Sequence, residues 1–133
     1  MPNNRDYEQV FVANPIDLKK YNFGDHLRNL VGPSPSGMFD PHAHHILFKT
    51  GLGETQKALV AKGQALLRSY GLDPIFGKEN LVWAPNGVKG QHAVGNLRTV
   101  VEALEEVHES LGTKAAIVKT LEKQGQIAAQ RKK

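Results

Sequence analysis

The stretch over residues 91–111 places the strongest constraint on the fold, because its apolar residues recur at spacings of three and four. The apolar positions are Val94, Leu97, Val101, Leu104 and Leu111. This periodicity predicts an amphipathic helix with one apolar face. The opposite face carries several glutamates, which we interpret as a solvated surface. A helix of this kind is stable only when its apolar face packs on other elements, so a mostly helical domain is expected.

Five other elements are predicted around this helix. Helical spacing favours residues 23–31, residues 54–70 and, more weakly, residues 113–128. In residues 23–31, this spacing places four apolar side chains on one helix face, namely Phe23, Leu27, Leu30 and Val31. Two short runs rich in strand-forming residues predict strands, namely residues 44–49 and residues 80–84. The fold class is therefore α+β, mostly helical.

The remaining segments are predicted to lack regular helices or strands. The segment before the His44-His45 pair, residues 32–43, is dense in Gly, Pro and Ser and predicts a loop. The first 22 residues predict an irregular or strand-like lead-in, and the chain ends in a basic tail over residues 130–133.

Length and composition limit the class of protein. With 133 residues the chain suits one domain, residues 1–133, with one modest core. Its apolar runs are far shorter than the roughly 20 residues that span a bilayer, and the N-terminus has no apolar signal core, so no membrane association or export signal of its own is expected. The chain contains no cysteine, which excludes disulfides and thiolate metal ligands. A net charge of +4 favours an anionic partner only weakly.

Histidines cluster in two short segments. His42, His44 and His45 lie in the sequence HAHH, and His92 lies near the start of the predicted long helix. Neutral imidazole is a common metal ligand. Because His92 and Asn96 are four residues apart, both side chains are predicted on one helix face, where they can approach one ion. These residues predict a metal site.

Adjacent residues in a strand point to opposite faces, so His44 and His45 are expected to take different roles. One ring can bind a metal while the other faces a substrate. Phosphodiester hydrolysis needs this division, because it requires a base to deprotonate water and a cation to stabilise the charge that grows on the phosphate.

The order of these residues resembles the AHH family of the HNH/endonuclease VII nuclease superfamily. The matching residues are Ala43-His44-His45-Ile46, then the run from Asn80 to Pro85, then His92 with Asn96. The upstream LRNLVGPSPSG is also similar, so the resemblance covers about residues 27–107. It implies a ββα-metal core over about residues 40–107, formed by the two strands and the helix that begins near His92.

The resemblance also implies a role for each residue. His44 and His92 are metal ligands, His45 is the general base and Asn80 orients the His45 region. Asn96 stands where the family usually has another ligand histidine. One divalent metal ion is expected, of the zinc class or of the magnesium and manganese class. An amide oxygen at this position favours magnesium or manganese over zinc, or leaves the position to a water.

Several further residues are candidates for the site or the core. His42 would share a strand face with His44 and is ranked below it as a substitute ligand. Arg98 is a possible phosphate contact, and Lys49, Lys89 and the basic tail widen the positive surface. Trp83 is interpreted as a core residue rather than as a platform for base stacking.

The leading hypothesis is an endonuclease that acts on nucleic acid, with DNA favoured over RNA. The resemblance implies the C-terminal toxin domain of a bacterial polymorphic or contact-dependent system. Such a domain is delivered as part of a larger secreted protein, acts in the target-cell cytoplasm and is neutralised by a cognate immunity protein. The alternative is a non-catalytic nucleic-acid or protein-binding module in which the histidines hold a structural metal.

Overall fold

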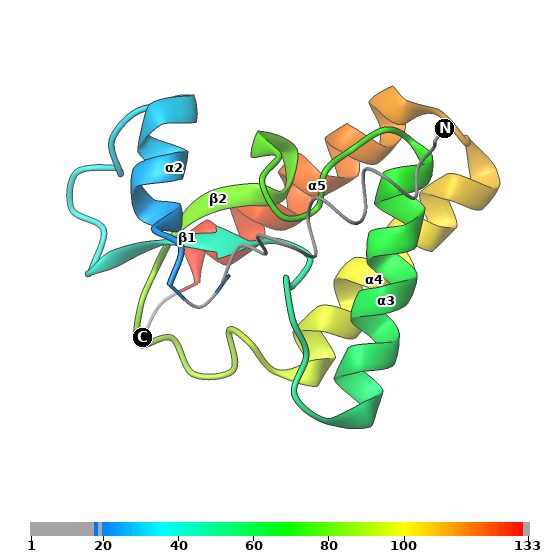
Figure 1. Cartoon of the computed structure of the whole chain (residues 1–133), viewed down its shortest axis with the longest axis horizontal. Helices are drawn as coiled ribbons and strands as arrows, with labels where there is room; N and C mark the ends of the chain where they lie inside the picture. Colours follow the sequence, from blue (N-terminus) through cyan, green and yellow to red (C-terminus); the bar gives the residue numbers. More distant parts are fainter. Residues whose placement is uncertain (1–17, 19, 132–133) are drawn as a thin grey trace, which may run out of the picture.

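A two-stranded antiparallel sheet lies at the centre of the molecule with helices around it (Figure 1). The computed structural model describes residue 18 and residues 20–131. These residues form an α+β fold that is mostly helical, as predicted. The elements are α2 (Phe23–Val31), β1 (Pro41–His45), α3 (Gly53–Ser69), the short 3-10 helix η1 (Lys78–Asn80), β2 (Leu81–Pro85), α4 (Val94–Ser110) and α5 (Lys114–Gln130). The lead-in predicted for the first 22 residues lies mostly outside the described residues.

The predicted helices are present, with two differences. In α2 only Phe23 and Leu27 are buried, while Leu30 and Val31 are 44% and 55% exposed, so half of the predicted apolar face is solvated. The long helix α4 begins at Val94 and not near residue 91, so His92 precedes it. None of the described helices is long and apolar enough to cross a membrane.

The start of α4 is delayed by two tight turns in residues 86–93. Gly87 and Gly90 both have a φ of 78°, a left-handed conformation that glycine adopts without steric cost. The N–H of Ala93 donates to the carbonyl of Gly90 at 3.0 Å, which closes the second turn immediately before the helix. The prediction that His92 and Asn96 share a helix face is therefore wrong, because His92 belongs to the loop.

The first strand lies earlier than predicted, at Pro41–His45 instead of residues 44–49. It pairs with β2 so that His44 is opposite Val82 and His45 is opposite Leu81. Beyond the strand, the N–H of Leu47 donates to Asn80 Oδ1 at 2.7 Å, and Asn80 Nδ2 donates to the Leu47 carbonyl at 2.8 Å. The Asn80 side chain thus takes the backbone groups that a longer strand would have paired.

The chain after β1 enters the core instead of continuing the sheet. Ile46, Leu47 and Phe48 are all buried. A Cβ atom on Gly63 of α3 would come within 2.7 Å of the Leu47 side chain, and one on Gly125 of α5 within 2.9 Å of Ile46. These two helices therefore approach the segment closely only because glycine stands at both contacts.

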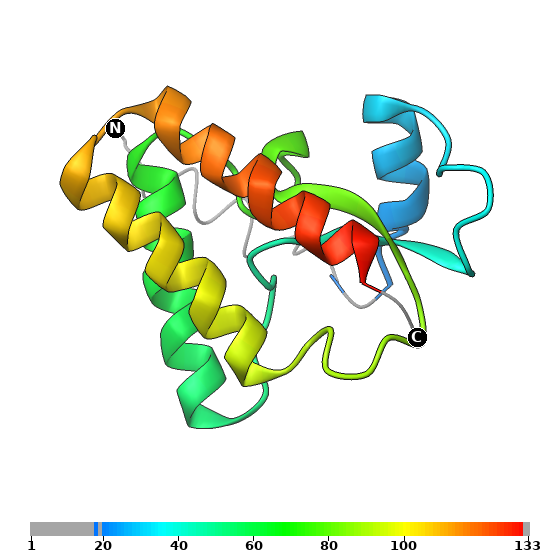
Figure 2. The same cartoon turned by 180° about the vertical axis from the view of Figure 1, so that it is seen from behind.

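Helix α5 lies behind the sheet, α2 lies on one side of it, and α3 and α4 lie on the other side (Figure 1). Helix α5 packs against β2, and α4 packs against α3 and α5 (Figure 2). The main core contains Leu67, Leu97, Leu104, Ile117 and Leu121, all fully buried. The sheet is thus covered chiefly by α5.

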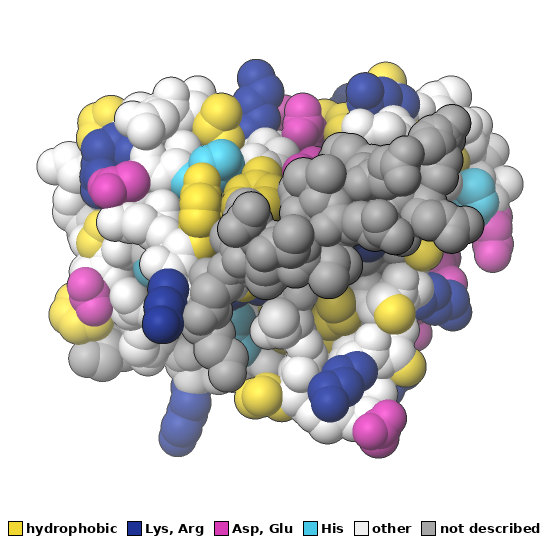
Figure 3. Space-filling view, viewed as in Figure 1, with side chains coloured by type: hydrophobic (Ala, Val, Ile, Leu, Met, Phe, Trp, Pro, Cys, Tyr) yellow, Lys and Arg dark blue, Asp and Glu magenta, His cyan; other side chains and the backbone are white. Residues whose placement is uncertain are grey.

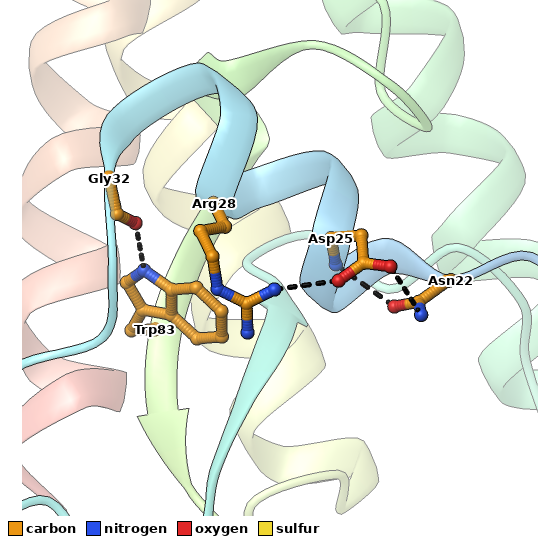
Figure 4. Close-up of polar contacts among 5 residues, drawn as sticks. All are labelled: Asn22, Asp25, Arg28, Gly32 and Trp83. Atoms are coloured by element: carbon orange, nitrogen blue, oxygen red, sulfur yellow. Dashed lines mark hydrogen bonds and ion pairs between the residues drawn. The ribbon is translucent and has the colours of Figure 1, made fainter.

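Helix α2 is fixed to the sheet by Trp83 of β2 (Figure 4). The indole Nε1–H donates to the Gly32 carbonyl at 3.1 Å, and the Arg28 guanidinium lies 5.8 Å from the ring centroid. Arg28 also pairs with Asp25 at 2.6 Å, and the N–H of Asp25 is capped by Asn22 Oδ1. Trp83 is 8% exposed, as expected of a core residue.

Replacing Asn80 with alanine should destabilise the fold strongly. Asn80 is 1% exposed and makes three side-chain hydrogen bonds to backbone, two to Leu47 and one to the Pro74 carbonyl at 2.8 Å. Leaving these buried groups unpaired should lower the free energy of unfolding by about 3 kcal/mol in urea denaturation. The exposed Asn29→Ala change should shift it by less than about 0.5 kcal/mol. Equal stabilities of the two variants would contradict this account.

Candidate metal and catalytic centre

Three histidines from two segments come together beside the sheet. His42 and His44 lie on the same face of β1 because they are two residues apart. His92 reaches them from the loop between β2 and α4. The ring centroids are 5.6 Å apart for His42 and His44, 5.0 Å for His44 and His92, and 5.8 Å for His42 and His92. One nitrogen of each ring lies within 4.8 Å of the others. Three histidines are thus close enough to hold one metal ion.

Three of the six ring nitrogens of this cluster are buried and unpaired among the described residues. Both nitrogens of His42 and the Nδ1 of His44 are buried and have no hydrogen-bond partner there. Buried polar atoms are normally paired, so three such atoms in one cluster need an explanation. A bound divalent metal supplies one, because imidazole nitrogen is among its preferred ligands. The residues present therefore fit a metal ion.

The cluster also favours the neutral rings that metal binding requires. Burial, with the nearby His92 and His42 as smaller causes, lowers the pKa of His44 to about 3. Burial is likewise the main cause that lowers the pKa values of His42 and His92. At neutral pH these rings are unprotonated and their lone pairs are available to a metal.

His45 has a different environment from its neighbour. Its Nε2 donates to the Ile75 carbonyl at 2.8 Å, and its ring packs edge-on against Phe23 with a centroid separation of 4.7 Å. Burial lowers its pKa to about 4, although the hydrogen bond to Ile75 opposes this shift. Because a carbonyl can only accept, Nε2 carries the proton and Nδ1 carries the lone pair. His44 and His45 thus have separate environments.

One cavity joins the two parts of the site. It has a volume of about 280 Å³ and is lined by His42, His44, His45 and His92. Lys49 also lines it, and its charge contributes to the lowered pKa values of His42, His45 and His92. Sequence reasoning gave Lys49 only a general electrostatic role. Nothing in the pattern distinguishes it from other lysines, because its place depends on the bend after β1.

Asn80 is close to the His45 region but does not bond to the imidazole. Its amide holds the backbone of Leu47, two residues after His45, and the carbonyl of Pro74. The next residue, Ile75, supplies the carbonyl that accepts from His45. Any influence of Asn80 on the His45 ring therefore acts through the backbone of Leu47 and of Pro74.

Two predicted site residues do not line this cavity. The Asn96 amide donates to the Gly90 carbonyl, and its Oδ1 accepts from Arg131 at 3.2 Å. Arg98 is exposed on α4. The predicted metal contact of Asn96 and phosphate contact of Arg98 stay predictions, while His42, ranked lower from the sequence, is the third histidine of the cluster.

Arg131 is a residue that sequence reasoning placed only in the basic tail. It follows α5 directly, and its guanidinium donates to Gln91 Oε1 at 2.6 Å. Its charge contributes to the lowered pKa of His44. No sequence signal marks this residue, since it is 39 positions from His92 along the chain.

The charged surface is mixed on the face drawn in Figure 3. Where described residues form this face, Lys and Arg side chains lie scattered among acidic and apolar ones. The net charge of +4 is thus spread out there. Charge on this face does not by itself indicate a nucleic-acid surface.

Comparisons with family models, with curated proteins and with solved structures found no match to this chain.

The buried histidines should make the metal-free protein less stable in mild acid. A histidine whose pKa is lower in the folded than in the unfolded chain favours unfolding as the pH falls below about 6.5. At pH 5, His44 and His45 should each reduce the free energy of unfolding by about 2 kcal/mol relative to pH 7. Urea denaturation with chelator present measures this difference.

Carboxylates also titrate in this range, so the decisive comparison is with the variants His44→Gln and His45→Gln. Each should remove about 2 kcal/mol from the difference between pH 7 and pH 5. An unchanged difference in both variants would show that the two rings are not buried as neutral groups.

Proposed function

We propose that the protein is a metal-dependent endonuclease of the HNH type that hydrolyses phosphodiester bonds. The observation that carries the proposal is the cavity that holds three clustered histidines together with His45, whose Nε2 donates to a backbone carbonyl. The cluster fits a cation, and the fourth histidine is held in the tautomer that can accept a proton. These are the two functions that phosphodiester hydrolysis needs.

His42, His44 and His92 would hold the metal in this proposal. A divalent cation bound there supplies electrostatic stabilisation to a phosphate and lowers the pKa of a bound water. The three rings leave room for a water or substrate oxygen, because zinc-type sites hold four ligands. The set differs from the one that the family resemblance implied, with His42 in place of Asn96.

His45 would be the general base. Its Nε2–H bond to Ile75 fixes the tautomer, so that Nδ1 is free to take a proton from water. The lowered pKa, about 4, keeps the ring neutral at pH 7, which a base requires. It also weakens the proton affinity of the ring, so the reaction depends on a water made more acidic than bulk water.

Lys49 is the cation best placed to contact the substrate phosphate. It lines the cavity beside the four histidines, whereas Arg98 does not. A lysine ammonium binds phosphate as a point charge and needs no fixed plane. This assignment replaces the phosphate role that sequence reasoning gave to Arg98.

The order of elements supports a ββα-metal core. β1 carries two cluster histidines, β2 pairs with it, and α4 follows the loop that carries His92. The packing differs from a self-contained core of this type, since α4 packs mainly on α3 and α5.

A structural metal in a non-catalytic binding module is the alternative. Such sites normally close all four positions with protein ligands. Among the described residues, the candidate group of His, Cys, Asp and Glu side chains contains only three members. An open position therefore favours catalysis over a purely structural role.

The biological setting follows from the family resemblance alone. We propose DNA as the favoured substrate and a role as the toxin domain of a larger delivered protein, acting in the cytoplasm of the target cell. A cognate immunity protein would then protect the producing cell.

The nuclease activity should be sensitive to chelator and should depend on His45. Purified protein is incubated with plasmid DNA and, separately, with total RNA, in the presence of zinc, manganese or magnesium. His45→Ala should lower the cleavage rate by about 10²–10⁴-fold. The control His108→Ala removes an exposed histidine of α4 outside the cavity and should cleave normally. Intact DNA and RNA with every metal would refute the proposal.

Lys49→Ala should reduce cleavage more than Arg98→Ala. Both changes remove one positive charge, so their long-range effects on an anionic substrate are similar. Only Lys49 lines the cavity, and its loss should lower kcat/KM by about 10-fold, against less than about 2-fold for Arg98. Steady-state cleavage of a labelled oligonucleotide measures both. An equal or larger loss in the Arg98 variant would restore the sequence-based assignment.

A further inference from the structure

The loop that carries His92 is held from the C-terminal end of α5 by a buried glutamine. Gln91 is 2% exposed, and both polar atoms of its side chain are bonded to this end of the chain. Its Nε2 donates to the Ala128 carbonyl at 3.0 Å, and its Oε1 accepts from Arg131 at 2.6 Å. The residue next to a candidate metal ligand is thus tied to a segment almost 40 positions away.

Arg131 makes a second bond that extends this connection to α4. Its guanidinium also donates to Asn96 Oδ1 at 3.2 Å, and the Asn96 amide donates to the Gly90 carbonyl. One planar guanidinium therefore joins the residue before His92 to the first turn of α4. The fixed fork of arginine suits such a pair of acceptors, whereas a lysine ammonium does not impose this geometry.

The contact of His92 with α3 is weak by comparison. The His92 carbonyl accepts from Gln56 Nε2 of α3 at 3.4 Å, near the limit of a hydrogen bond. Ala93, the residue that precedes α4, has no side-chain hydrogen bond to cap the helix. Two glycines with positive φ lie in the same loop. Besides the backbone bond from Ala93 to Gly90 that closes the turn, the bonds made by Gln91 and Arg131 thus fix the residue next to His92 to the end of α5.

We infer that Arg131, through Gln91 and Asn96, is a positioning residue that holds His92 at the metal site. The inference rests on the proposed metal site, but it concerns metal affinity and not cleavage. The end of α5 would then be part of the site, although it contributes no ligand. Residues that orient metal ligands typically change metal affinity by about 10–100-fold when they are replaced.

The sign of the effect distinguishes positioning from simple electrostatics. Arg131 is a cation near His44, so its charge alone opposes the binding of another cation. If Arg131 acted only as a charge, Arg131→Ala would bind metal more tightly than the unmodified protein. If it positions His92, the same change weakens binding.

The test is a Zn²⁺ titration of the full chain in competition with a colorimetric chelator. Arg131→Ala should weaken Zn²⁺ binding by about 10-fold, and Arg131→Lys should restore little of the loss. The matched control Lys123→Ala removes an exposed cation of α5 and should bind Zn²⁺ normally. Thermal unfolding of the metal-free variants checks that Arg131→Ala and Lys123→Ala are equally folded.

A double-mutant cycle with His92→Ala then locates the effect. In the His92→Ala background, Arg131→Ala should cause no further loss of Zn²⁺ affinity, because the ligand it positions is absent. Unchanged or tighter binding in the single Arg131→Ala variant would overturn the inference, as would additive losses in the double variant. A protein that binds no Zn²⁺ at all would overturn it together with the metal site. If Zn²⁺ binding changes in the variants as expected but the protein cleaves no nucleic acid, the inference stands and the nuclease proposal is refuted.

Discussion

The hydrogen bonds between the Asn80 amide and the backbone of Leu47 determine how the rest of the structure is arranged. They end the pairing of β1 with β2 directly after His45 and turn the chain into the core. Ile46 and Leu47 then contact α5 and α3 at two glycines. The same amide holds the Pro74 carbonyl, so the segment that bonds His45 is fixed to the same point. One buried side chain thus links the sheet, two helices and the proposed base.

The alternation of β1 explains how neighbouring histidines receive different environments. His42 and His44 share one face and meet His92, while His45 turns to Ile75 and Phe23. A helix would have spread the three histidines of β1 around its surface. The short strand therefore separates the proposed ligands from the proposed base, and burial is the main cause that lowers the pKa values of all four rings.

The helices were predictable from the sequence because their periodicity is local, and the four main ones lie within a few residues of the expected bounds. The separation of His44 from His45 was predictable for the same reason, since it follows from strand geometry alone. The bounds of β1 were not predictable from the sequence. The strand ends where the side chain of Asn80 bonds to the backbone of Leu47, and these two residues are 33 positions apart. Arg131 was missed for a similar reason: its role depends on the packing of α5 beside the loop of residues 86–93, and no local pattern carries that information.

The histidine cluster changes the metal that the chemistry of the site favours. With Asn96 as a ligand, an amide oxygen would shift preference toward magnesium or manganese. The clustered donors are instead three imidazoles, and Asn96 is bonded to Gly90 and Arg131. Nitrogen donors favour zinc and its transition-metal neighbours over magnesium, whose preferred ligands are oxygens. The half-buried position of the cluster adds to this preference, because magnesium loses its water shell reluctantly. On the donor set proposed here, we therefore expect a transition metal rather than magnesium to bind most tightly.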